Sequence, residues 1–264
     1  MNRTPWLSFL AAGALGVVAG AACGGDEPGE VPGGPAANIP AQVRFSVTCG
    51  DAEPAAQVFQ VVNSGTEELL VRSAEVTGGF TVTAALPITL QPGANITFSV
   101  QPPAAEVGVD RGGSVKSGVL SIDTDDPRGK TQVQLRAEVK GANLEFTDAE
   151  GQPVSAVAVV PVGLDDCGAA PHVFLRNSGN AGVTYDSATG HHTVTRVAES
   201  SELPGGESLE FSVEPDATDA CVINSDLSFT VTGDVCIAPP TLTVTQTGDG
   251  GETCFCGGGG GSGT

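Results

Sequence analysis

Two stretches of the chain decide its fold, because the second repeats the first. Residues 59–65 read Phe-Gln-Val-Val-Asn-Ser-Gly, and residues 173–179 read Val-Phe-Leu-Arg-Asn-Ser-Gly. Each copy is followed by a Pro-Gly turn and then by an alternating apolar strand that ends in Pro102 or Pro215. The residues common to both copies are turn formers and apolar core residues, not acids, bases or metal ligands. The duplication therefore predicts two related domains and argues against catalysis.

Apolar residues recur with a period of two through both copies. In residues 96–100, for example, Ile, Phe and Val alternate with Thr and Ser, a pattern that buries one face of a strand. Runs bounded by Gly, Pro, Asn and Asp predict strands at residues 42–48, 57–62, 68–76, 79–84, 95–101, 117–123 and 131–139, and again at 154–162, 172–176, 182–185, 192–198, 208–214, 226–232 and 240–246. Such short antiparallel strands predict an all-β chain with two tandem immunoglobulin-like (Ig-like) β-sandwiches.

The first 22 residues are predicted to be an export signal. Arg3 supplies a positive charge, and residues 6–22 are uncharged and end in small residues. The apolar run is short for a membrane span, which needs about 20 residues. Residues 20–23, Gly-Ala-Ala-Cys, resemble the bacterial lipoprotein signal, in which the Cys receives diacylglycerol. We therefore predict that acylated Cys23 anchors the chain in a lipid bilayer of the bacterial cell envelope. Gly24 favours the outer membrane over the inner one.

The alternative is ordinary secretory cleavage after residues 19–21, which would release a soluble secreted protein. In either case residues 23–40 are rich in Gly and Pro and lack apolar periodicity, so a flexible tether is expected there. The predicted domains are then residues 41–141 and 142–248. Residues 249–264 form a Gly-rich tail that contains cysteines.

The charge balance argues against nucleic acid as a partner. The chain has 11 Lys and Arg against 31 Asp and Glu, a net charge of −20, and phosphate binding needs clustered basic residues. Hydrophobic residues make up 40% of the chain. The chain can therefore bury cores and is not a disordered polyanion.

The first copy carries an ordered set of turn and strand residues that ends in an Asp-Asp-Pro turn. They are Asn63, Gly65, Gly79, Phe80, Leu90, Pro92, Gly93, Pro102, Gly118, Leu120, Ile122, Asp125, Asp126 and Pro127. In this order they resemble the Ig-like domains of the abnormal-spindle/hydin (ASH) family. In bacteria such domains occur in exported proteins, and the resemblance implies no catalytic residues. The second copy keeps Asn177, Gly179, Leu203, Gly205, Gly206, Pro215, Leu227 and Phe229, but it lacks the Asp-Asp-Pro turn and has Cys236 in that region.

Six cysteines besides Cys23, an even number, predict disulfide bonds in an exported chain. Cys221 and Cys236 flank one predicted strand whose ends would be about 25–30 Å apart, too far for the roughly 7 Å limit between bonded Cα atoms. Cys49 lies in the loop between the first two predicted strands of the first domain (the A–B loop), and Cys236 lies in the loop between the last two of the second domain (the F–G loop). If the domains stack end to end, these two loops would face each other. We predict a bond between those two. The remaining cysteines would form two more bonds or, alternatively, a four-thiolate zinc site; they are Cys167, Cys221, Cys254 and Cys256.

Two other clusters contain residue types that bind metal ions. His191 and His192 would point to opposite faces of a strand, so a surface or turn pair is expected. Asp123, Asp125 and Asp126 offer oxygen ligands for calcium, but the EF-hand spacing is absent and a tight turn is expected. No motif for a nucleophile, a phosphate loop or a dinucleotide site occurs, so no enzyme activity and no cofactor are expected.

These patterns together predict a non-catalytic, membrane-anchored envelope lipoprotein that serves as a structural or protein-interaction module. Another envelope protein would be its partner, and the expected contact regions are residues 103–116 and residues 191–192. The competing hypothesis is an envelope binding protein for a small ligand or a divalent cation, held at the domain junction or at the acidic loops.

Overall fold

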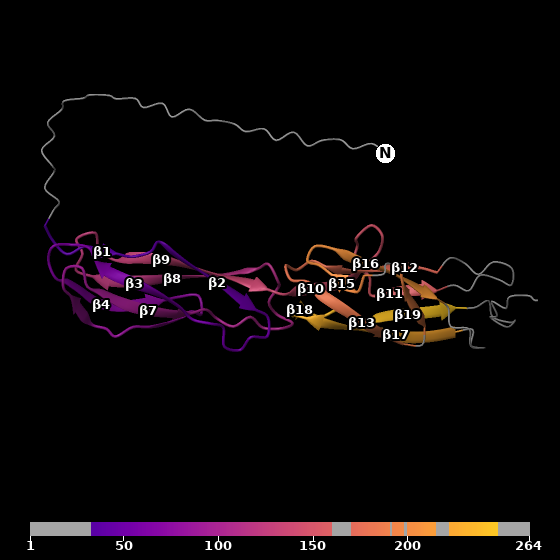
Figure 1. The fold of residues 1–264 in the computed structure, drawn as a ribbon. Helices are drawn as coiled ribbons and strands as arrows, with labels where there is room; N and C mark the ends of the chain where they lie inside the picture. The colour runs from indigo at the N-terminus through magenta and orange to yellow at the C-terminus, as the bar shows by residue number, and fades with distance from the viewer. Residues whose placement is uncertain (1–32, 160–169, 191, 198–199, 215–221, 248–264) are drawn as a thin grey trace, which may run out of the picture. The chain divides into compact units, whose positions relative to one another are not determined.

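The computed structural model describes residues 33–159, 170–190, 192–197, 200–214 and 222–247. Every regular secondary-structure element in these described residues is a β-strand (Figure 1). The chain divides into Met1–Gly33 and a compact unit, Gly34–Thr264, and the strands belong to the second. Among the described residues there is no helix with the length and hydropathy that crossing a membrane requires.

The first sandwich has two sheets. In one, the strand order is β1-β3-β7-β5, with bounds Ala37–Asn38, Gln57–Asn63, Asn95–Gln101 and Thr81–Thr83. In the other, the order is β2-β9-β8-β4-β6, with bounds Gln42–Thr48, Thr131–Lys140, Val115–Thr124, Leu69–Val76 and Ile88–Leu90.

The second sandwich repeats this arrangement with one addition. One sheet has the order β14-β16-β12-β10-β18, with bounds Thr193–Arg196, Ser208–Glu214, His172–Asn177, Ala142–Thr147 and Val235–Ile237. The other has the order β11-β19-β17-β13-β15, with bounds Ala156–Val159, Leu242–Thr247, Val222–Gly233, Val183–Thr189 and Glu202–Leu203. Strand β18 has no counterpart in the first sandwich.

Most strand pairs are antiparallel, as predicted for an Ig-like fold, but three are parallel: β2 with β9, β11 with β19, and β10 with β18. The first two have a common origin. The chain starts on one sheet, at β1 or β10, and then crosses to the other sheet, where β2 or β11 runs beside the last strand. In the first sandwich Pro40 lies at this crossing, where its missing N–H ends pairing with β3.

Each sandwich buries its own apolar cluster, as the period-two pattern predicted. Phe98 and Phe211 occupy matching places in β7 and β16 and are almost completely buried. Cys236 and Ile237 of β18 pack against the cluster of the first sandwich, although they follow the strands of the second in the chain. Strand β18 therefore connects the two cores.

The expected strands are present, and five short ones were not predicted: β1, β6, β10, β15 and β18. Strand β1 lies inside residues 23–40, the expected tether, and Ala37 is buried. Strand β10 was missed because only Gly141 separates it from β9. Without a longer turn signal, the sequence did not divide these residues into two strands.

The repeated Asn-Ser-Gly turns are built alike. Asn63 Nδ2 donates to the carbonyls of Glu67 and Leu90, at 2.7 and 2.9 Å, and its Oδ1 accepts the N–H of Gly65 at 3.0 Å. Asn177 repeats this pattern with Ala181, Leu203 and Gly179. Both asparagines are fully buried, and a buried amide is tolerated when its donors and acceptor are all satisfied. The repeat thus preserves the same hydrogen-bonded turn in both sandwiches.

Candidate functional site at the junction of the sandwiches

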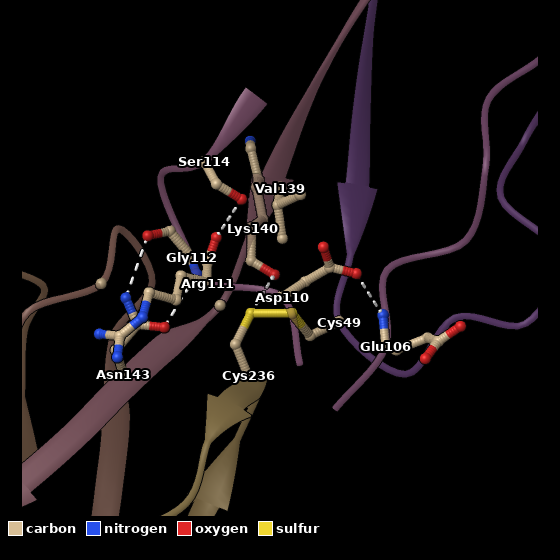
Figure 2. Close-up of a disulfide and its surroundings, with 12 residues drawn as sticks. Cys49, Glu106, Asp110, Arg111, Gly112, Ser114, Val139, Lys140, Asn143 and Cys236 are labelled. Atoms are coloured by element: carbon tan, nitrogen blue, oxygen red, sulfur yellow. Dashed lines mark hydrogen bonds between the residues drawn. A yellow bond between two sulfur atoms is a disulfide. The ribbon is translucent and has the colours of Figure 1, made fainter. Parts of the chain in front are cut away.

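A disulfide bond joins the two sandwiches (Figure 2). Cys49, directly after β2, is bonded to Cys236 in β18, with Cα atoms 5.2 Å apart across 187 residues of sequence. The predicted Cys49–Cys236 bond is confirmed. Because β17 lies between Cys221 and Cys236 and Cys236 is already bonded, a Cys221–Cys236 bond is excluded.

The loop from Pro103 to Lys116 packs around this disulfide. Ala105 forms a parallel bridge with Cys49, and the N–H of Gly108 donates to the carbonyl of Cys236 at 2.8 Å. Lys116 pairs with Asp110 at 2.8 Å, which braces the loop from within. The sequence analysis expected residues 103–116 to be a contact region, and Gly108 and Gly112 of this loop contact the second sandwich of the same chain.

Asn143 makes a reciprocal contact across the junction. Its Oδ1 accepts the N–H of Gly112 at 2.8 Å, and its Nδ2 donates to the Gly112 carbonyl at 3.1 Å (Figure 2). Asn143 is only 5% exposed, so these bonds replace those it would make with water. Nothing in the sequence pattern singled out this residue.

Asn180 adds a second set of bonds. Its Nδ2 donates to Glu138 Oε1 at 3.0 Å and to the carbonyl of Val139 at 3.1 Å, and its Oδ1 accepts the N–H of Gly141. The junction therefore combines one covalent bond with hydrogen bonds from two asparagine side chains.

Gly141 is required by close packing. A Cβ at this position would overlap Cys236 Sγ. Gly34 stands at the matching place before the first sandwich, since its carbonyl accepts from Thr66 as that of Gly141 accepts from Asn180. A Cβ at Gly34 would meet nothing within 4 Å.

Gly141→Ala is expected to lower the free energy of unfolding by about 1–3 kcal/mol, because the added methyl overpacks the disulfide. It should also speed reduction of Cys49–Cys236 by dithiothreitol, followed by mass spectrometry. Urea unfolding of Gly34→Ala gives the matched control, with an expected change within about 0.5 kcal/mol. Equal effects of the two substitutions would contradict the packing role of Gly141.

Three aspartates lie at the turn between β8 and β9 (the F–G turn of the first sandwich), and each is bonded to another residue of the chain. Asp123 pairs with Arg72 at 3.6 Å, and Asp125 Oδ1 accepts the N–H of Leu70 at 2.9 Å. Asp126 is buried and binds Arg128, with Nη2 to Oδ2 at 2.6 Å. Among the described residues no group of three His, Cys, Asp or Glu side chains is placed to hold a metal ion. The expected tight turn agrees with these contacts.

Asp126 is the electrostatic centre of this turn. Its Oδ2 accepts the N–H of Ala37 in β1 at 2.7 Å, while Arg128 donates to the Ala37 carbonyl at 2.7 Å. The hydrogen bonds from Arg128, with smaller help from the Ala37 N–H, hold the pKa of Asp126 well below its usual value against the opposing effect of burial. The ion pair thereby fixes β1 to the sandwich.

Asp126→Asn is expected to lower the free energy of unfolding by about 2 kcal/mol at pH 7. Since the folded pKa is depressed, the carboxylate stabilises the fold above its unfolded pKa of about 3.9, and this contribution is lost as the pH falls through the folded value. The difference from wild type should therefore shrink below about pH 4 in urea unfolding. Asp123→Asn, in an exposed pair, should change stability by less than about 1 kcal/mol. A difference that stays constant from pH 7 to pH 3 would be inconsistent with the ionic role.

The histidines differ from expectation. His192 lies in a bend before β14 but is only 4% exposed, so the expected surface position is wrong for it. Its Nδ1 lies 2.6 Å from Ser225 Oγ of β17, and this polar partner allows the ring to be buried. His172, in β12, pairs with Glu210 at 2.6 Å. His191 lies outside the described residues.

Several predicted site residues also lie outside the described residues. They are the lipidation site Cys23 and the remaining disulfide candidates Cys167, Cys221, Cys254 and Cys256. Their lipidation, pairing or zinc binding stays a prediction.

The comparisons with known proteins give a likeness of fold only. No protein-family model and no curated protein matches the chain. A solved protein of unknown function from Porphyromonas gingivalis W83 is 15% identical over 81% of this chain and 99% of its own, with a TM-score of 0.30. The CupB2 chaperone of Pseudomonas aeruginosa is 13% identical over 80% and 100%, with a TM-score of 0.30. The D00-D0 domain of intimin is 12% identical over 80% and 98%, with a TM-score of 0.37. The Ig-like assignment rests on the strand order and cores described above.

Proposed function

We propose that the chain is a non-catalytic lipoprotein of the bacterial cell envelope that serves as a structural or protein-interaction module. The observation that carries this proposal is the covalent junction. The Cys49–Cys236 bond and the Asn143–Gly112 pair tie two Ig-like sandwiches into one unit. A force that a partner protein applies to one sandwich is thereby transmitted to the other, as a structural role requires.

The disulfide also supports export. Such bonds persist in oxidising compartments and are rare in the cytosol, and Cys49 and Cys236 are both buried. Residues 20–23 support acylation of Cys23, and Gly24 supports the outer membrane. An ASH-type relationship is part of the same proposal, supported by the turn residues of the first copy.

Lipid anchoring is tested by metabolic labelling with palmitate in a bacterial host. The wild-type chain should be labelled, retained with membranes and sensitive to globomycin. Cys23→Ala should lose the label and appear in the soluble fraction. Cys49→Ser is the control, because it removes a cysteine of the mature chain without touching the signal; it should keep the label although it also breaks the Cys49–Cys236 bond. A labelled Cys23→Ala, or a wild-type chain released as a soluble protein, would refute the anchor.

The loop beside the disulfide offers a contact for a partner protein. Val107 and Val109 are 56% and 70% exposed. Gly108, between them, is bonded to the carbonyl of Cys236, so the junction positions both valines. Two exposed apolar side chains held in place cost little entropy on binding, which favours this loop as a contact surface.

Photocrosslinking tests this surface in the native envelope. A photoreactive residue at position 109 should give one discrete protein adduct. Position 58, a valine of similar exposure (69%) in β3, serves as the matched control and should give none. Absence of an adduct at 109, or the same adducts at both positions, would contradict an interaction through this loop.

A small-ligand binding protein is the second candidate, supported by a hollow at the junction. It has a volume of about 280 Å³ and is lined by Arg111 of the first sandwich and by residues of the second that include Asn143 and Ser178. The sequence also allowed a divalent cation as the ligand, but among the described residues no group of side chains is placed to bind one.

A further inference from the structure

Two arginines face each other on the outer side of the first sandwich. Strands β2 and β9 pair in parallel with Arg44 opposite Arg136, and β8 places Ser117 opposite Arg136 from the other side. All three residues are exposed. The register thus puts two guanidinium groups and a hydroxyl in one row across three strands.

This pairing is unfavourable unless an anion joins it. Like charges directly opposite each other in a sheet are destabilising. Three other cations of the described chain have carboxylate partners: Arg72 with Asp123, Lys116 with Asp110, and Arg128 with Asp126. Arg44 and Arg136 have none within ion-pair distance among the described residues, although the chain carries 31 acidic side chains. Other described cations, such as Arg111 and Arg176, also lack such a partner, so what distinguishes Arg44 and Arg136 is that they lie opposite each other. The row is therefore a positive site on an acidic protein.

The arginines border a hollow of about 210 Å³, separate from the hollow at the junction. Its lining consists of Arg44, Phe45, Val115, Arg136 and Glu138. Arg44 is already oriented by Gln42, whose Oε1 accepts from Nε and Nη2 at 3.4 and 3.3 Å. The hollow supplies room beside the guanidinium groups for a ligand.

Glu138 limits which anion fits. It follows Arg136 by two residues on the same face of β9, so its carboxylate lies about 7 Å along the strand. This carboxylate makes a multiply charged anion such as a phosphate less favourable at the arginines than a single carboxylate. A ligand with one carboxylate at the arginines and a cationic or N–H donor group about 7 Å away would satisfy both ends.

We infer that the row Arg44, Arg136 and Ser117 binds the carboxylate of an acidic side chain in an extended peptide segment, and that Glu138 receives a basic side chain two residues further along that segment. Guanidinium forks match carboxylates in two-point hydrogen bonding. In an extended chain, residues i and i+2 are on one face and about 7 Å apart, which equals the spacing of the site. This inference rests on the proposed interaction role and names the chemistry of the partner.

The test uses acetyl-Glu-Ala-Lys-amide as the probe and NMR of the arginine Nε–H groups as the readout, at 0.15 M NaCl. The Nε–H signals of Arg44 and Arg136 should shift in a saturable way. Acetyl-Gln-Ala-Lys-amide, which lacks the carboxylate, should bind at least about fivefold more weakly. Shifts of equal size at all arginines, or equal binding of both peptides, would overturn the inference.

Variants separate the site from general charge attraction. Arg44→Gln and Arg136→Gln should each weaken binding about fivefold, while Arg176→Gln, an exposed arginine of β12, should leave it unchanged. Glu138→Gln should abolish the preference for this probe over acetyl-Glu-Ala-Ala-amide. Thermal unfolding should be the same in the arginine variants, because these side chains are exposed. Glu138→Gln keeps a side-chain oxygen that can accept the hydrogen bond from Asn180, so it too should unfold at the same temperature.

The outcomes distinguish this inference from the proposed function. Unchanged affinity in the Arg44→Gln, Arg136→Gln double variant would refute the arginine site. Crosslinking at position 109 would remain valid in that case, because it reports a different surface.

Discussion

The connection between the sandwiches depends on the buried amide of Asn177. Its Oδ1 accepts the N–H of Gly179 within the turn and, at 3.2 Å, the N–H of Asn143 on the incoming strand. With its backbone held there, Asn143 directs its own side chain to Gly112 of the first sandwich. Two consecutive asparagine contacts therefore lead from the core of one domain to a loop of the other, and the disulfide lies beside them.

The two copies solve one problem in different ways. Each must fix its first strand at the F–G turn. In the first copy Asp126 and Arg128 hold Ala37 through side chains. In the second, β18 holds Ala142 and Asn143 through parallel backbone pairing. The second solution brings Cys236 against the first core, so the strand that replaces the Asp-Asp-Pro turn in the second copy also forms the junction.

The sequence predicted what local patterns encode. Period-two runs located most strands, and Ig-like topology placed Cys49 and Cys236 in loops that meet. Short strands such as β15 and β18 have too few residues for a periodic signal. The row of Arg44 and Arg136 was not predictable, because it depends on the parallel register between strands about ninety residues apart. The burial of His192 depends likewise on Ser225, a partner from a distant strand.

The two cysteines of the disulfide are 187 residues apart, so the ribosome makes Cys49 long before Cys236. In the proposed export, which begins at the N-terminus, Cys49 would cross the membrane before Cys167 and Cys221, and Cys236 would follow both. The first available thiols are thus the wrong partners for Cys49. In that case the native bond could form only after Cys236 had emerged, and any bond that Cys49 made earlier would have to be resolved by disulfide exchange in the receiving compartment.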